Sequence, residues 1–406
     1  MPFRLALSGL NAAQTDLTVT ANNVANVATT GFKGSRAEFA DLFAATQQGV
    51  SATAIGNGVR VSDVSQQFSQ GNIDFTDNSL DLAISGNGFY VMNDNGALSY
   101  TRAGAFQVNN EGFVVNSRQQ HLQVYPPLPN GGFNTGGLSD LSLTTNVSAP
   151  QATSTLDIVA NLPASATSPV NFAAFDPADP TSYNNTTSVT VYDTLGAAHT
   201  ASLYFAKGAT ANNWESRLYI DGTAVGGAQP LVYTDAGQLV TPAGGEITFP
   251  AYTTATGSAP ITMTIDFGAT TQFGDNFTVS STLQDGFTTG RLIGIDIDAS
   301  GVVQARFTNG RSNSLGKIAM ANFANPQGLQ QLGDTSWAET FASGQALKGE
   351  AGQSGFGLIQ AGALEASNVD ITEQLVNMIT AQRNFQANAQ MISTADQITQ
   401  TIINIR

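Results

Sequence analysis

The chain has 406 residues, and its hydrophobic fraction of 41% is enough for sizeable cores. At roughly 150 residues per domain, this length suggests about two to four domains. The net charge of −15, with only 15 Lys and Arg, argues against a nucleic-acid binder, because phosphate neutralisation needs clustered basic residues. The absence of cysteine excludes disulfides, cysteine-ligated zinc, iron–sulfur clusters and a thiol nucleophile. We expect neither a membrane span nor a cleavable secretory signal, since no apolar run is long enough.

An amphipathic helix is predicted near the start of the chain, over residues 3–28. Large apolar residues recur there at intervals of seven, and Leu7 lies on the same stripe, which is a heptad pattern. The stripe consists of Phe3, Leu7, Leu10, Leu17 and Val24. The pattern is compatible with a helix that packs on its own domain and with a helix that pairs with a second helix.

Residues 29–70 change in character. A short helical pattern over residues 37–45 is followed by an alternating VRVSDV strand at residues 59–64. We interpret this segment, together with residues 346–363, as a partly extended connector.

The middle of the chain is rich in strands and turns. Residues 71–145 and 286–345 share short strands separated by Asn-Gly, Glu-Gly and similar turns. Residues 146–285 alternate apolar and polar residues without helical patterns, which is typical of a sandwich or barrel. We therefore predict one discontinuous β domain, 71–145 with 286–345, that is split by an inserted outer β domain at residues 146–285.

The last segment, residues 364–406, has no Gly or Pro and is predicted to be a long helix. Its apolar stripe needs a partner, and the heptad helix at the other end of the chain matches it. The fold class is thus mainly β, with long N- and C-terminal helices paired in the manner of a coiled coil. Apart from the N-terminal stripe, the predicted assembly residues are Ile371, Leu375, Met378, Phe385, Ile392 and Ile402.

Enzymatic chemistry finds little support in the sequence. His121 and His199 lie in strand-like contexts without a spaced ligand partner, and no nucleophile elbow or phosphate-binding loop is present. Asp296 opens a segment like a calcium loop, but the twelfth position holds Phe307 in place of the required Glu. A strand that ends in a tight turn explains this segment better. We therefore expect no cofactor, no metal site and no catalytic residue.

Both ends of the chain carry long motifs. At the N-terminus, SGLNAAQTDLTVTANNVANVATTGFK contains Ala21, Asn22, Asn23, Ala25, Asn26, Thr30, Gly31, Phe32 and Lys33. At the C-terminus, LEASNV is followed by AQRNF, which contains Gln382, Arg383 and Asn384. These motifs resemble the signatures of the bacterial flagellar rod and hook family. Internal segments such as DLAISGNGFYV and LGKIAMANFANPQGL extend the resemblance over nearly the whole chain.

The resemblance implies a structural protein that polymerises into a helical tube. Within the family, the large insert at residues 146–285 favours a subunit of the curved, flexible hook, which acts as a universal joint and encloses the export channel. The implied partners are copies of the chain itself, the flagellar rod, the hook cap and hook–filament junction proteins, and the flagellar type III export apparatus. The implied location is the extracellular hook.

Two alternatives remain at this stage. The chain could be a distal rod component of the same family, although such a component lacks a large central insert. It could also be a surface adhesin, although an adhesin would need its own secretion signal and has no reason for matched heptad termini.

Overall fold

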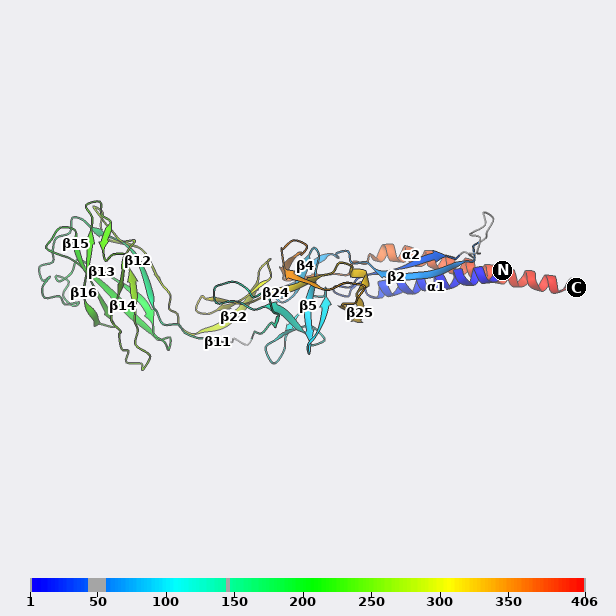
Figure 1. The fold of residues 1–406 in the computed structure, drawn as a ribbon, viewed down its shortest axis with the longest axis horizontal. Coiled ribbons are helices and arrows are strands. Elements are labelled where there is room, and N and C mark those ends of the chain that lie inside the picture. The colour runs from blue at the N-terminus through cyan, green and yellow to red at the C-terminus, as the bar shows by residue number, and fades with distance from the viewer. Residues whose placement is uncertain (1, 43–55, 144–146, 405–406) are drawn as a thin grey trace. The chain divides into compact units, whose positions relative to one another are not determined.

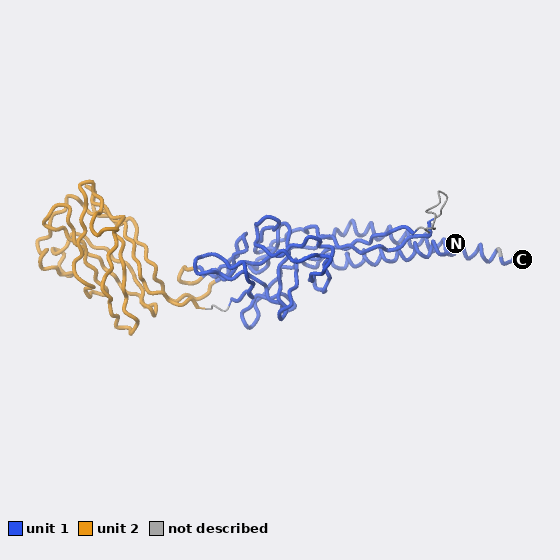
Figure 2. The backbone as a smooth tube through the Cα atoms, viewed as in Figure 1, with its two compact units in different colours: residues 1–145, 294–306, 312–406 blue, residues 146–293, 307–311 orange. Residues whose placement is uncertain are grey.

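The computed structural model describes residues 2–42, 56–143 and 147–404. Over these residues the fold is mainly β, with one long helix near each end of the chain, α1 (Pro2–Ala25) and α2 (Ile371–Asn404) (Figure 1). The two helices pack against each other, so the predicted fold class is confirmed. The chain divides into two compact units (Figure 2): residues 1–145, 294–306 and 312–406, and residues 146–293 and 307–311.

Both helices are shorter than predicted. α1 ends at Ala25, before residue 28, where the chain enters a turn and the side chain of Asn26 donates to the carbonyl of Asn22. α2 begins at Ile371 and not at residue 364, because the preceding segment is a strand, β29 (Ala363–Glu365), paired with β3 (Ile73–Phe75). The helical pattern alone did not mark this boundary.

The segment after α1 is also corrected. Instead of a short helix at residues 37–45, the structure has β1 (Ser35–Asp41), which pairs antiparallel with β2 (Val59–Gln66) and packs with it on α1. Residues 43–45 lie outside the described residues. Pairing with β2 and burial of alternate side chains outweigh a weak helical propensity here. The predicted connector at residues 29–70 therefore contains a strand pair that supports the helix.

The largest sheet combines strands from both sides of the central segment. In β24 (Ser312–Asn322), Met320 and Ala321 pair with β5 (Phe89–Asp94), and other residues pair with β9 (His121–Tyr125). The sheet's remaining described strands are β6 (Ala97–Thr101), β7 (Gln107–Val108), β8 (Val114–Val115), β10 (Ser139–Asp140), β11 (Val147–Ser148), β22 (Gly290–Ile297), β23 (Val302–Phe307), β25 (Gln330–Gly333), β26 (Ser336–Ala338) and β27 (Leu347–Glu350). A 3₁₀ turn, η1 (Pro326–Gly328), precedes β25.

This sheet is buried on both faces where β5 and β24 run. Tyr90 and Met92 of β5 belong to one apolar cluster, and Phe89 and Val91 belong to another. Successive side chains of a strand point to opposite faces, so the two clusters lie on the two sides of the sheet.

The strands β27 and β28 (Leu358–Ala361) correct the second predicted connector, residues 346–363. β27 joins the large sheet beside β24, and β28 pairs with β4 (Leu82–Ser85). Because their backbone hydrogen bonds are made with distant strands, these residues are part of the β structure of the first unit.

The second unit is a sandwich of two sheets around one core. Every second residue of β12 (Thr155–Pro163) and of β15 (Asn213–Ile220) is buried, as expected for sheets with one face inward. One sheet consists of β12 with β18 (Glu246–Thr248), β19 (Thr264–Asp266), β20 (Thr271–Phe273) and β21 (Thr278–Gln284); the other consists of β15 with β13 (Asn185–Tyr192), β14 (Ala198–Lys207), β16 (Thr223–Tyr233) and β17 (Leu239–Thr241). Their inner side chains form a shared core that contains Trp214 and Phe205.

Candidate functional site

The site that the sequence points to is the pair of terminal helices. Two contacts fix how they lie. A Cβ atom on Gly9 would come within 2.5 Å of Asn388 Oδ1, and Asn23 Nδ2 donates to Gln374 Oε1 over 3.2 Å. From Gly9 to Asn23 the chain advances 14 residues along α1, and from Asn388 to Gln374 the facing position moves back 14 residues along α2. The helices are antiparallel in one register, which brings Asp16 level with Ala381.

Small side chains make the close contact between the helices. Ala6, Ala13 and Thr20 of α1 are buried at intervals of seven, and Ala381 of α2 is fully buried. On α2, half-buried positions alternate by three and four residues around Ala381: Gln374, Met378, Phe385, Asn388, Ile392 and Ala395, with Ala389 also half-buried next to Asn388. This alternation keeps one stripe of α2 against α1. The small residues of α1 let the two backbones approach closely.

The predicted assembly residues are divided between this contact and the exposed surface. Phe3 and Leu7 are 52% and 41% exposed, and Ile371 and Leu375 are 48% and 46% exposed. The half-buried predicted residues are Leu10, Leu17, Val24, Met378, Phe385 and Ile392, and the side chain of Ile402 lies outside the described residues. The predicted N-terminal stripe thus lies beside the small-residue contact and does not form its centre.

The sequence prediction missed further exposed apolar side chains on α2. Ile379 is 50% exposed and continues the line of Ile371 and Leu375 at steps of four residues, which is one face of a helix. The other exposed residues of this kind are Val376, Met391, Ile398 and Ile403. The spacing of Ile371, Leu375 and Ile379 at i, i+4 and i+8 was the signal in the sequence that could have identified this line.

A buried ionic network anchors both helices to the β structure. Lys33 Nζ donates to Glu365 Oε1 over 2.6 Å, and Arg102 Nη1 donates to Glu365 Oε2 over 3.1 Å. The N–H of Gly71 also donates to Glu365 Oε1, over 2.9 Å. Burial disfavours the ammonium ion and lowers the pKa of Lys33, against the attraction of Glu365. One carboxylate therefore joins the end of the α1 segment, the start of the α2 segment and the large sheet.

The backbone at Gly31 approaches this network closely. Its N–H donates to the carbonyl of Glu365 over 2.7 Å, and a Cβ atom at this position would lie 2.6 Å from the nitrogen of Ala103. Only glycine fits such an approach at a φ of 68°. Gly31 and Lys33, both signature residues, are therefore explained by packing at this junction.

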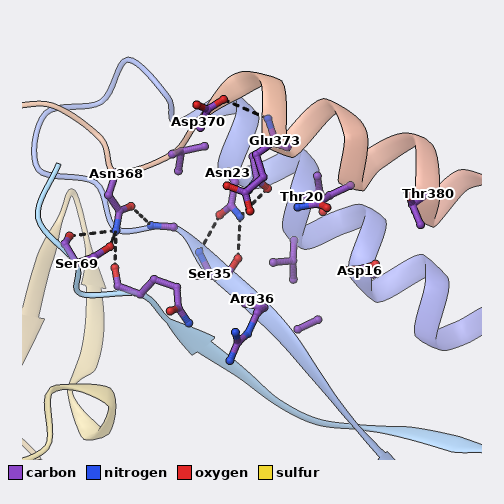
Figure 3. Close-up of a pocket in the computed structure, with 17 residues that line it drawn as sticks. Asp16, Thr20, Asn23, Ser35, Arg36, Ser69, Asn368, Asp370, Glu373 and Thr380 are labelled. Carbon is purple, nitrogen blue, oxygen red and sulfur yellow. Dashed lines mark hydrogen bonds between the residues drawn. The ribbon is translucent and has the colours of Figure 1, made fainter. Parts of the chain in front are cut away.

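Asparagine side chains complete the junction. Asn23 binds both backbone groups of Ser35: its Oδ1 accepts from the N–H over 2.8 Å, and its Nδ2 donates to the carbonyl over 2.7 Å. Asn368 Oδ1 accepts from the N–H of Gly34 over 2.8 Å, and its Nδ2 donates to the carbonyl of Gln67 over 2.6 Å (Figure 3). These contacts hold the β1–β2 pair between the two chain ends. Asn368 was quoted in the C-terminal motif but was not among the predicted site residues.

The other signature residues have simpler surroundings. Asn26 donates to the carbonyl of Asn22 over 2.9 Å and accepts from Thr29, which closes the end of α1. Phe32 and Thr30 are half-buried beside this turn. The signature residues that are exposed on the helices are Ala21, Asn22, Ala25, Gln382, Arg383 and Asn384.

A histidine cluster in the second unit was not expected from the sequence. His199 Nδ1 lies 2.6 Å from Asp221 Oδ2, and His199 Nε2 lies 3.4 Å from Asp193 Oδ2. Thr256 donates to the same oxygen of Asp193 over 2.7 Å. Desolvation would lower the pKa of His199, but the hydrogen bonds to the two carboxylates raise it. Both ring nitrogens face carboxylates, so the cluster ties together three loops of the sandwich.

Across the part of the chain that the structure describes, no three His, Cys, Asp or Glu side chains are grouped so that they could hold a metal ion. The calcium-like segment is a tight turn, in which Asp298 Oδ1 accepts from the N–H groups of Ser300 and Val302. Neither described helix has the length and hydropathy that a membrane crossing requires.

The fold and helix pair match the family of flagellar axial proteins. Four family models match the chain: "Flagella basal body rod protein" at residues 3–33, "Flagellar hook protein FlgE/F/G D1 domain" at 83–161, "Flagellar basal body protein FlaE D2 domain" at 161–287, and "Flagellar basal body rod FlgEFG protein C-terminal" at 360–405. The first and last of these cover the two helices, and the middle two cover β structure of both units.

Curated relatives narrow the class to the hook. The chain is 39% identical over 417 residues to the flagellar hook protein FlgE of Escherichia coli (strain K12), with all of both chains covered. It is 32% identical over 436 residues to that of Borreliella burgdorferi, with 98% of each chain covered. The chain belongs to the flagellar hook protein FlgE family and is a structural subunit of the hook.

A solved structure has the same fold. The crystal structure of the Helicobacter pylori flagellar hook protein FlgE2 matches with a TM-score of 0.54 at 14% identity, covering 72% of this chain and 100% of that chain.

Proposed function

We propose that the chain polymerises through its terminal helix pair into a curved, flexible tube, the hook, which transmits motor torque to the filament as a universal joint and encloses the export channel. The observation that carries this proposal is the row of exposed apolar side chains on α2, Ile371, Leu375 and Ile379, together with Phe3 and Leu7 on α1. A soluble monomer gains nothing from such exposure, whereas burial against a neighbour is favourable.

The two helices cover each other on only one side. Their mutual contact uses small residues such as Ala13 and Ala381, so the larger side chains beside it remain free for neighbouring copies. A contact between two different surfaces of identical copies generates a helical assembly when its rotation does not close into a ring. The Asn, Gln, Ser and Thr residues on the remaining helix surface suit the wall of a channel that must not bind passing charged chains.

The inserted sandwich has a separate role in this proposal. Bending requires neighbouring subunits to change their separation as the tube rotates. The polar outer strands of residues 146–285 would slide past one another, while the apolar helix contacts hold the tube together. Deleting this insert should give an assembling tube with altered curvature.

Family membership supports the remaining partners. The tube that this chain builds would meet the flagellar rod at one end and the hook cap and hook–filament junction proteins at the other. The chain would leave the cell through the flagellar type III export apparatus.

Electron microscopy of purified protein tests the proposal. Leu375→Asp should leave the circular dichroism of the monomer unchanged, because the side chain is half exposed, and should abolish the tubes that the unmodified chain forms. Val170→Asp, which places the same charge at an exposed apolar position of the second unit, should still assemble. Normal tubes from Leu375→Asp would refute the assigned surface, and straight polymers from the unmodified chain would favour a rod component.

A further inference from the structure

A groove runs between α1, the start of α2 and β1 (Figure 3). Its volume is about 450 Å³, and three carboxylates line it: Asp16 of α1, Asp370 and Glu373. Arg36 of β1 is the basic residue in the lining, and it already pairs with Glu38 over 3.0 Å. The groove therefore holds an excess of negative charge.

Asp16 is the member of this group that is both half-buried and without a partner among the described residues. It is half-buried, and desolvation raises the pKa of its carboxyl group. Within the described ranges, neither a hydrogen-bond donor nor a cation contacts its side chain. Asp370 differs, because its Oδ1 accepts from the N–H groups of Thr372 and Glu373 at the start of α2. A cation from outside the chain would compensate for the interactions with water that the Asp16 carboxylate loses on burial.

Arg383 is a cation with complementary placement. It is exposed, and no acceptor in the described part of the chain contacts its guanidinium group. It follows the fully buried Ala381 by two residues, which is about 200° around the helix axis, so it is directed away from α1. The register of the helices brings Asp16 level with Ala381, so Arg383 and Asp16 lie at nearly the same height along the pair, about 3 Å apart in axial position.

We propose that this groove is the docking site for Arg383 of a second copy of the chain, with Asp16 as its main acceptor and Glu373 beside it. The proposal rests on the proposed self-assembly and specifies one of its contacts. The donor and the acceptor lie on different surfaces of one helix pair. Each copy can therefore offer Arg383 to one neighbour and receive the Arg383 of another, so the contact is heterologous and can be repeated from copy to copy. The planar guanidinium group suits a carboxylate because it can donate two parallel hydrogen bonds.

Charge reversal tests the pairing. Arg383→Glu and Asp16→Arg should each reduce the fraction of chain that sediments as polymer at least tenfold, while the monomer keeps its circular dichroism. The double variant Asp16→Arg/Arg383→Glu should restore polymer, because the pair is re-formed with opposite signs. Arg291→Glu reverses an exposed charge of the second unit and should assemble normally.

Cross-linking tests the geometry independently, and the natural chain has no cysteine to interfere. With a short bismaleimide cross-linker, which spans the separation that an Arg–Asp pair leaves between two cysteines, an equal mixture of Asp16→Cys and Arg383→Cys chains should give cross-linked dimers, whereas neither variant should do so alone. A chain carrying both changes should give a ladder of multimers.

The outcomes separate this inference from the proposed function. If the unmodified chain polymerises and Arg383→Glu polymerises equally well, the pairing is wrong and the assembly surface stands. A double variant no better than the single ones, or dimers from one cysteine variant alone, would also overturn it. If the unmodified chain forms no polymer at all, the proposed function itself fails.

Discussion

Lys33 and Glu365 form a fully buried ion pair, with 2.6 Å between Nζ and Oε1, although 332 residues separate them in the sequence. The pair lies where the segment after α1 meets the segment before α2. Burying an ammonium and a carboxylate together costs desolvation energy, so the pair is more informative about specificity than about net stability. It fixes how both chain ends leave the β structure.

Glu365→Gln should strongly destabilise the first unit. It leaves the charges of Lys33 and Arg102 buried without their carboxylate, and removing one partner of a buried pair costs about 3–5 kcal/mol. Urea denaturation followed by tryptophan fluorescence measures this loss, because the chain has two tryptophans, Trp214 in the second unit and Trp337 in the first. In chains that retain only one of them, the Trp337 transition should shift and the Trp214 transition should not.

A matched control for this prediction is Glu38→Gln. Glu38 pairs with Arg36 on the exposed surface of β1, where solvent screens the interaction. Its removal should leave both transitions unchanged. A Glu365→Gln chain as stable as the unmodified one would mean that the network contributes nothing.

The second unit should lose stability as the pH rises above about 6.5, the ordinary pKa of histidine. The carboxylates of Asp193 and Asp221 raise the pKa of His199 in the folded state. Because the pKa of His199 is higher in the folded state than in the unfolded state, the histidine stabilises the folded unit. This stabilisation is fully present below the unfolded-state pKa, about 6.5, and it is lost as the pH rises through the folded-state pKa. The urea midpoint reported by Trp214 should therefore fall between about pH 6.5 and the folded pKa of His199. His199→Gln should flatten this dependence, and an unchanged slope would refute it.

Asp370 should contribute as the N-cap of α2. Its Oδ1 accepts from the N–H of Thr372 over 2.7 Å and from that of Glu373 over 3.1 Å. Asp370→Ala should cost about 1 kcal/mol, as measured by urea denaturation with Trp337 fluorescence. Asp370→Asn keeps a capping oxygen and should cost much less. Equal losses from the two variants would show that charge, and not the cap, matters at this position.

Gly104→Ala should destabilise the first unit through overpacking. A Cβ atom at this position would overlap the carbonyl oxygen of Leu82, which is backbone and has no room to move. A loss of about 3 kcal/mol is expected, at the upper end of what overpacking costs. Gly137→Ala is the control, since a Cβ atom there would meet nothing within 4 Å. Denaturation midpoints of the two variants should differ clearly, and similar midpoints would contradict the prediction.

Periodicity and turn signals predicted much of the fold. A two-residue alternation identified β13, β14 and β15 as strands of a sandwich or barrel, because successive residues of a strand face opposite sides. The helical spacing at both ends predicted α1 and α2. Their boundaries were missed because Ala363–Glu365 and Ser35–Asp41 become strands by pairing with distant segments. Local sequence carries little record of such long-range pairing.

For the pair of terminal helices, too, the sequence predicted one part and the tertiary structure decided another. The sequence by itself determined that both chain ends are helical, that they carry apolar stripes, and that they match the flagellar hook family. Only the tertiary structure decided which side chains the two helices use on each other. Ala6, Ala13 and Ala381 are buried there, while Phe3, Leu7 and Leu375 remain exposed. The physical reason is that helices approach most closely where side chains are small, and a heptad pattern of large residues cannot show which neighbour will cover it.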